Sequence, residues 1–85
     1  MFKVTIYFDA KDVGQTMFAK VGTPNKQNYL KVYQEALKIH VADCLGLPPS
    51  KLPIIAGMYL GPRSSVTFEF VTQKALDAFK KKHGL

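Results

Sequence analysis

The chain of 85 residues is 47% hydrophobic and 21% charged, and its 12 Lys and Arg residues against 6 Asp and Glu give a net charge of +6. This length suits one domain with one hydrophobic core, so we expect residues 1–85 to form a single domain. The apolar content excludes an intrinsically disordered chain. The apolar runs are too short for a bilayer span or a signal peptide, so we expect no membrane partner.

The cysteine content indicates the cellular compartment, and the net charge indicates the class of partner. A single cysteine, Cys44, excludes an intramolecular disulfide and a cysteine-rich zinc site, and it favours a reducing, cytoplasmic environment. The net charge of +6 favours anionic partners, either nucleic acid or a protein with an acidic surface. We expect no cofactor, because the chain has no phosphate-binding loop, dinucleotide motif or zinc-protease motif.

The first half of the chain predicts a hairpin followed by a long helix. Residues 2–8 alternate apolar and polar side chains with the period of a half-buried strand. Asp and Gly residues then indicate a turn, and a weaker alternation over residues 15–21 predicts a second strand. The helix begins with Thr23 or Asn25 as its N-cap and ends at Gly46, before two prolines. Its apolar face is wide enough to contact the sheet and also a second helix or a partner chain.

The second half predicts another hairpin and a shorter helix. Residues 54–60 form the third expected strand, residues 61–64 a turn, and residues 66–70 an alternating fourth strand. Thr72 is the expected N-cap of the last helix, which ends at Gly84. The element order is therefore β-β-α-β-β-α. We expect an α+β two-layer sandwich, in which a four-stranded antiparallel sheet packs both helices on one face.

The sheet face opposite the helices is the main candidate site. Alternation along the expected strands directs to this face aromatic side chains that can stack on bases, and cations at its rim can neutralise phosphates. The aromatic residues are Tyr7, Phe18 and Tyr59, and the cations are Lys3, Lys20 and Arg63. Ile55 also faces outward if the third strand buries Ala56, Met58 and Leu60. An equally supported alternative is that aromatic residues are simply common in strands and that the apolar face forms a homodimer.

A lysine cluster near the C-terminus is the second candidate. Lys80, Lys81, Lys82 and His83 occupy the last turn of the final helix, where they either contact phosphates or simply suit the helix dipole. On its own the cluster indicates a solvated helix end. Together with the other cations of the second half it strengthens the case for binding an anion.

Catalysis is the least supported class of function, and we expect no enzyme. Cys44 lies on the apolar side of the long helix, where a free cysteine usually packs as a small hydrophobic residue. His40 and Asp43 are three residues apart and form a candidate acid–base or metal pair, although a semi-buried histidine satisfied by its neighbour is the commoner arrangement. A small ribonuclease that uses His40, His83 and lysines ranks third among the functions considered.

The expected function is non-enzymatic binding of single-stranded DNA or RNA through the open sheet face and the basic C-terminal helix. The alternative is a protein-interaction module, such as a virus- or mobile-element-encoded inhibitor or adaptor of a host enzyme. Such a module would use the same sheet face or the exposed strand edges. The two functions differ in salt dependence, because phosphate contacts release counterions and apolar docking does not.

Overall fold

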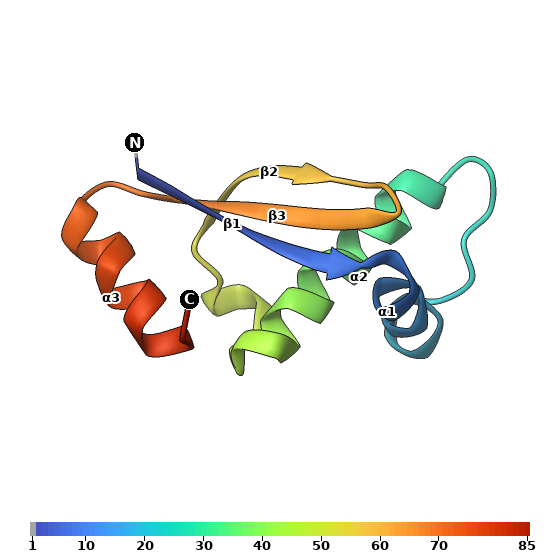
Figure 1. The fold of residues 1–85 in the computed structure, drawn as a ribbon. Coiled ribbons are helices and arrows are strands. Elements are labelled where there is room, and N and C mark those ends of the chain that lie inside the picture. The colour runs from blue at the N-terminus through green and yellow to red at the C-terminus, as the bar shows by residue number, and fades with distance from the viewer. Residues whose placement is uncertain (1) are drawn as a thin grey trace.

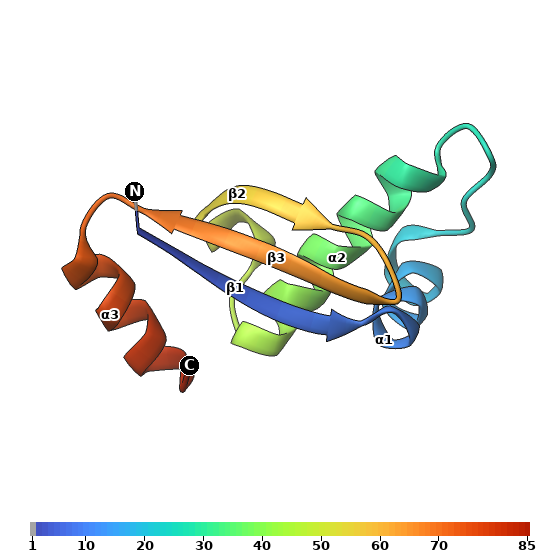
Figure 2. The same cartoon turned by 45° about the horizontal axis from the view of Figure 1, so that its top comes forward.

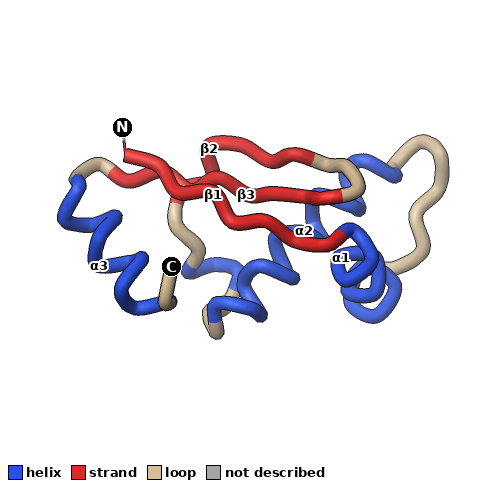
Figure 3. Tube along the Cα trace, in the orientation of Figure 1, coloured by secondary structure: helices blue, strands red, loops and turns tan. Residues whose placement is uncertain are grey.

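The computed structural model describes residues 2–85, which form a three-stranded antiparallel sheet and three α-helices. The strands lie in the order β1-β3-β2, and the helices lie together on one side of the sheet (Figures 1 and 3). In chain order the elements are β1 (Phe2–Asp9), α1 (Ala10–Thr16), the π-helical turn η1 (Met17–Val21), α2 (Tyr29–Leu45), the 3-10 turn η2 (Pro49–Lys51), β2 (Ile54–Tyr59), β3 (Arg63–Phe70) and α3 (Gln73–His83). The chain is α+β, but the prediction of a four-stranded sheet with two helices, in the order β-β-α-β-β-α, is wrong.

Residues 15–21 account for the difference, because they belong to a helix and not to a second strand. The Asp9 carboxylate accepts a hydrogen bond from the backbone N–H of Lys11 at 2.9 Å and so caps the start of α1. Val13 and Met17, four residues apart, are both buried, with 0% and 4% exposure. This helical spacing outweighs the alternation over residues 15–21, and Ala19, which alternation directs inward, is exposed.

The long helix α2 lies beneath the sheet. It begins at Tyr29, later than the predicted N-caps Thr23 and Asn25, because the Asn25 carboxamide accepts hydrogen bonds from two backbone N–H groups and holds a turn ahead of the helix. The helix ends at Gly46, whose φ of 70° provides the left-handed C-cap that the sequence predicts. Buried residues of α1, η1, α2 and β3 form the core, and they are Val13, Met17, Tyr33, Ala36, Leu37, Val41, Val66 and Phe68.

The register of β1 against β3 separates the two faces of the sheet. The pairing runs without a shift from Phe2 opposite Phe70 to Asp9 opposite Arg63, so alternate residues share a face. The even-numbered residues of β1 face the helices, as the alternation predicts, and three of them, Val4, Ile6 and Phe8, pack against the core. The other side is the open sheet face, and Figure 2 shows it with α2 behind the strands.

A bulge in β2 changes which residues reach the open sheet face. The register shifts at Ala56, which has no partner on β3. As a result Ile55 and Met58 pack against the core, whereas Ile54 and Tyr59 lie on the open sheet face. The predictions that Ile55 faces outward and that Ala56 is buried are therefore wrong, because strict alternation does not allow for an extra residue.

The last helix, α3, lies on the helix side of the sheet, next to the end of β3 (Figures 1 and 2). Thr72 caps it as predicted, since the Thr72 hydroxyl accepts a hydrogen bond from the backbone N–H of Ala75 at 3.1 Å. Phe79 of this helix packs against Phe68 and Phe70, with ring centroids 5.7 and 5.1 Å apart. These aromatic contacts hold α3 on the end of the sheet.

Candidate functional site

Two exposed tyrosines define the open sheet face. Tyr7 of β1 and Tyr59 of β2 both pair with Ser65 of the central strand β3. Neighbouring strands lie about 4.8 Å apart, so the Cα atoms of the two tyrosines lie on the order of 10 Å apart, with one small side chain between them. Tyr7 is 58% exposed and Tyr59 is 63% exposed. Both phenol rings are therefore available to a ligand on this face.

Neighbouring groups restrict the position of each ring. A Cβ atom on Gly61 would lie 2.8 Å from Cε1 of Tyr59, so only the absence of a side chain at Gly61 lets this ring lie against the turn between β2 and β3. The guanidinium carbon of Arg63 lies 5.0 Å from the centroid of the Tyr7 ring, which is a cation–π distance. A restricted ring loses less conformational entropy when a ligand stacks on it.

The centre of the open sheet face is flat and polar. The hydroxyl groups of Thr5 and Thr67 share a hydrogen bond of 2.8 Å between β1 and β3. Gly57 pairs with Thr67 from the other side, and it adds no side chain to the surface. The small residues between the two edges leave room for planar groups to lie on the sheet.

The cations of the open sheet face lie at its two ends. Arg63 pairs in register with Asp9, and Lys3 pairs in register with Glu69. The Asp9 carboxylate is already occupied by the cap of α1. Within residues 2–85, neither Lys3 nor Arg63 forms an ion pair. Both charges are therefore free to meet a phosphate group.

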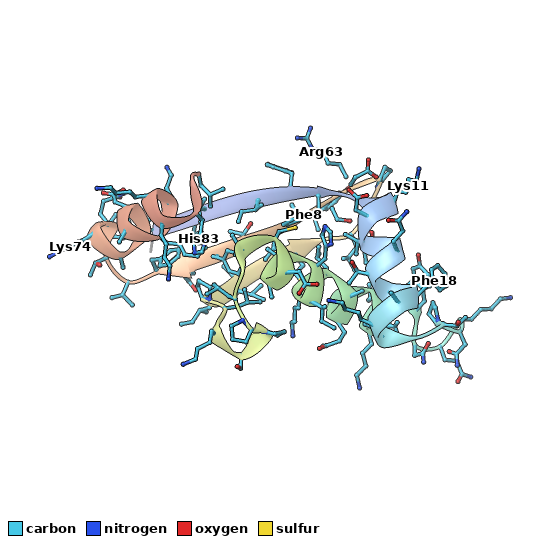
Figure 4. The ribbon with its side chains drawn as sticks, turned by 90° about the horizontal axis from the view of Figure 1, so that it is seen from below. Phe8, Lys11, Phe18, Arg63, Lys74 and His83 are labelled. Carbon is cyan, nitrogen blue, oxygen red and sulfur yellow. The ribbon has the colours of Figure 1, made fainter. Side chains whose placement is uncertain are left out.

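Two predicted site residues, Phe18 and Lys20, lie on η1 and not on the sheet, because the second strand that was to carry them is a helix. The Lys20 ammonium donates a hydrogen bond to the Asp43 carboxylate of α2 at 2.6 Å. Phe18 is 64% exposed at the end of the molecule formed by α1 and η1 (Figure 4). Of the six residues expected on the sheet platform, the fold thus brings together four, which are Lys3, Tyr7, Tyr59 and Arg63.

The predicted lysine cluster, Lys80 to Lys82, occupies the last turn of α3. Lys81 and Lys82 are exposed, and Lys80 is half-buried. Because α3 packs on the helix side of the sheet, this cluster does not lie on the open sheet face. The helix itself contacts both β1 and β3.

The residues considered for catalysis lie apart from one another or are chemically unsuited. The His40 Nδ1 lies 3.1 Å from the Thr16 hydroxyl, and its Nε2 lies 3.7 Å from the Cys44 Sγ. Burial raises the pKa of the Cys44 thiol, and the carboxylates of Asp43 and Asp12 raise it further. A raised pKa keeps the thiol protonated and opposes a nucleophilic thiolate. His83 lies instead against Phe79 on α3, at a ring centroid distance of 4.6 Å.

A metal site finds no support in the described part of the chain. Residues 2–85 contain no group of three or more His, Cys, Asp or Glu residues arranged to hold a metal ion. The Asp43 carboxylate is paired with Lys20 and not with His40. The His40 and Asp43 pair that the sequence singled out therefore does not form a ligand set.

An apolar groove of about 560 Å³ lies between α1, η1, the start of α2 and the turn after β2. Its lining includes Gly14, Phe18, Pro24, Tyr29, Leu30 and Leu60. The groove could not be found while residues 15–21 were assigned to a strand. The sequence does contain a feature that indicates this groove. If Asp9 is the N-cap of a helix, then Ala10, Gly14 and Phe18 are spaced by four residues and lie on one side of that helix.

Comparison of the chain with protein-family models, curated proteins and solved structures gives no match. Across residues 2–85, none of the helices is long and apolar enough to cross a membrane. The function must therefore be argued from the surfaces that the chain itself presents.

Proposed function

We propose that this protein binds single-stranded nucleic acid through the open sheet face. The observation that carries the proposal is the placement of Tyr7 and Tyr59 on either side of Ser65, both exposed, with the Arg63 guanidinium against the Tyr7 ring. Aromatic rings on a flat sheet stack on unpaired bases, and each such contact contributes about 1–3 kcal/mol.

Each group on the face has a part in this proposal. Tyr7 and Tyr59 stack on two bases, and the small residues between them admit the sugar and base edges. Lys3 and Arg63 neutralise phosphates at the two ends of the face. The Thr5 and Thr67 hydroxyl groups offer further hydrogen bonds that any base can use. Binding is therefore tolerant of sequence and selective for unpaired strands, because bases inside a duplex cannot reach the rings.

The lysine cluster of α3 acts at longer range in this proposal. Lys80, Lys81 and Lys82 add positive potential at the edge of the sheet formed by β1, and they attract a strand that extends past the open sheet face. Their contribution depends on ionic strength, since exposed charges are screened within about 8–10 Å at physiological salt.

The proposed role is non-enzymatic and requires no cofactor. The raised pKa of the Cys44 thiol supports the absence of thiol catalysis, since the thiolate is the reactive form. The cytoplasm is the proposed compartment, because the single cysteine of the chain is a free thiol.

The experiment that tests the proposal is a fluorescence-anisotropy titration of a labelled single-stranded oligonucleotide and of its duplex. Replacing both Tyr7 and Tyr59 by alanine removes two stacking contacts and weakens single-strand binding about 30-fold or more. Tyr29→Ala is the matched control, because Tyr29 is also an exposed tyrosine, at 52%, but lies on α2. This control retains the affinity of the parent protein. Equal affinity of the double variant, with its fold intact by circular dichroism, contradicts the proposal.

A protein-interaction module remains the second candidate, and the edge strand β1 favours it. Its eight residues pair only with β3 in the described sheet, so the other side of the strand is open to an additional strand. Strand addition and apolar docking depend little on salt, whereas phosphate binding weakens steeply as salt rises. The salt series in the anisotropy titration therefore separates the two functions.

A further inference from the structure

One wall of the apolar groove is the helix formed by α1 and η1, and the two sides of this helix face different environments. Asp12, Thr16 and Lys20 are spaced by four residues and face the C-terminal half of α2. Thr16 contacts His40, Lys20 contacts Asp43, and the Asp12 carboxylate helps to raise the pKa of the Cys44 thiol. The other side of the same helix carries Ala10, Gly14 and Phe18, again spaced by four, and these line the groove. In Figure 4, Phe18 and Lys11 mark this end of the molecule.

Part of the groove wall is empty at Gly14, although the fold does not require a glycine at this position. It lies inside α1, where glycine costs about 0.5–1 kcal/mol relative to alanine. Its φ is not positive, and a Cβ atom built on it meets nothing within 4 Å. Neither the backbone nor close packing therefore requires glycine here. The absence of a side chain at Gly14 leaves the groove open beside Phe18.

The groove is built for apolar side chains. Phe18, Tyr29 and Leu30 are exposed on its walls at 64%, 52% and 61%. The hydroxyl of the buried Tyr33 is already within hydrogen-bond distance of the Ser64 hydroxyl, at 2.9 Å. Small-molecule sites orient their ligands with several convergent polar groups, whereas the residues that line this groove are mostly apolar. Anchoring by large apolar side chains of a protein segment fits this surface better.

The elements around the groove favour a helical segment. α1, η1, the start of α2 and the turn after β2 form its walls, and no residue of a β-strand lines it. An extended peptide would find no strand edge there on which to satisfy its own N–H and C=O groups. A helix satisfies those groups internally and presents its apolar face to the groove.

Charge complementarity identifies an acidic partner. Lys26 lines an adjoining pocket that shares Phe18 and Tyr29 with the groove, and no carboxylate lines either one. The first turn of α2, whose positive dipole end faces this region, contains Lys31 and no acidic residue. A second copy of the chain is the less suitable occupant, because each copy carries a net charge of +6.

We propose that the apolar groove binds an amphipathic, acidic helix of a partner protein. Its large apolar side chains enter between Phe18, Leu30 and Leu60, and its carboxylates face Lys26 and the start of α2. This interaction is independent of the open sheet face. The protein then joins two partners, a nucleic acid on the sheet and an acidic protein at the end formed by α1.

The test is a selection from a displayed library of randomised peptides of about 16 residues, or about four helical turns, on the 85-residue protein. The counter-selection uses Gly14→Leu, which fills the groove at a position where a Cβ atom meets no neighbour. Peptides that prefer the parent protein carry apolar residues at helical spacing with acidic residues beside them. A synthetic peptide of the selected sequence, titrated by anisotropy, binds Gly14→Leu at least about tenfold more weakly than the parent.

Two further variants make the outcome decisive. Leu30→Ser alters a side chain that is 61% exposed and so leaves the core intact, and it also weakens peptide binding about tenfold or more. The double alanine variant of Tyr7 and Tyr59 retains full peptide affinity. The proposal is wrong if the selected peptides are enriched equally on Gly14→Leu and on the parent protein. It is also wrong if the selected peptides contain no excess of acidic residues. A concentration-dependent dimer that Gly14→Leu abolishes overturns it as well, since this result assigns the groove to a second copy.

Discussion

Tyr7 and Tyr59 both pair with Ser65 of the central strand β3, although they belong to the two opposite edge strands of the sheet. The bulge accommodates Ala56 as an extra residue, so that Ile55 and Met58 both face the core while Tyr59 reaches the open sheet face. The tyrosine pair is therefore a product of the register on both sides of β3.

Deletion of Ala56 tests this account of the register. The residue has no partner on β3, so its removal leaves a regular strand in which Ile55 and Met58 still face inward and Tyr59 still pairs with Ser65. We expect a folded protein whose affinity for single-stranded nucleic acid stays within about twofold of the parent. Circular dichroism and an anisotropy titration measure both properties. An unfolded protein, or loss of binding, shows that the bulge itself is required.

Arg63→Gln tests the phosphate contact on the open sheet face. Loss of one contact with a single strand reduces the slope of log affinity against log salt by about 0.7. Lys31→Gln is the matched control, because Lys31 is an exposed cation of α2 that lies away from the sheet. An anisotropy titration at several salt concentrations gives both slopes. The same slope for Arg63→Gln as for the parent protein rules out a phosphate contact at Arg63.

Gly14→Ala tests whether the open groove wall lowers stability. Alanine adds about 0.5–1 kcal/mol to the free energy of unfolding, because it lowers the entropy of the unfolded chain and meets no neighbour in the folded one. Gly46→Ala has the opposite effect, since its φ of 70° strains any residue with a side chain. Urea denaturation measures both changes. A loss of stability in Gly14→Ala reveals a contact that requires glycine.

The reactivity of Cys44 tests the environment between α1 and α2. Burial, Asp43 and Asp12 all raise the pKa of its thiol, so iodoacetamide alkylates the folded protein more slowly at pH 8 than a denatured sample. Asp43→Asn lowers this pKa and speeds alkylation, whereas Asp77→Asn on α3 does not. Because the unfolded chain loses the thiol proton first, this group lowers stability as the pH rises above the ordinary cysteine pKa. Alkylation as fast as in the denatured sample contradicts this account.

The elements with strong local signals could be predicted from the sequence. The alternation of β1, the Thr72 cap of α3 and the Gly46 end of α2 all depend on short-range preferences, and the structure contains each of them. Residues 15–21 were mispredicted because their apolar residues fit both periods. The cap at Asp9 and the burial of Val13 with Met17 decide in favour of the helix.

The positions of some residues expected on the sheet platform depend on contacts with residues that are distant in sequence. Alternation within β1 places Tyr7 on the face away from the helices, and Arg63, which was expected in a turn at the rim of this face, lies on β3 beside it. The position of Tyr59 depends on a bulge, which only the pairing with β3 reveals. Phe18 could be placed in the groove only after the helix that carries it was known.

The most direct test of nucleic-acid binding on the open sheet face is an NMR titration of the ¹⁵N-labelled protein with a short single-stranded oligonucleotide. The account predicts that the largest amide shifts fall on the central part of the sheet, at Thr5, Tyr7, Tyr59 and Ser65, and that a duplex of the same sequence leaves them unchanged. Shifts confined to α3, or no shifts at low salt, would contradict it.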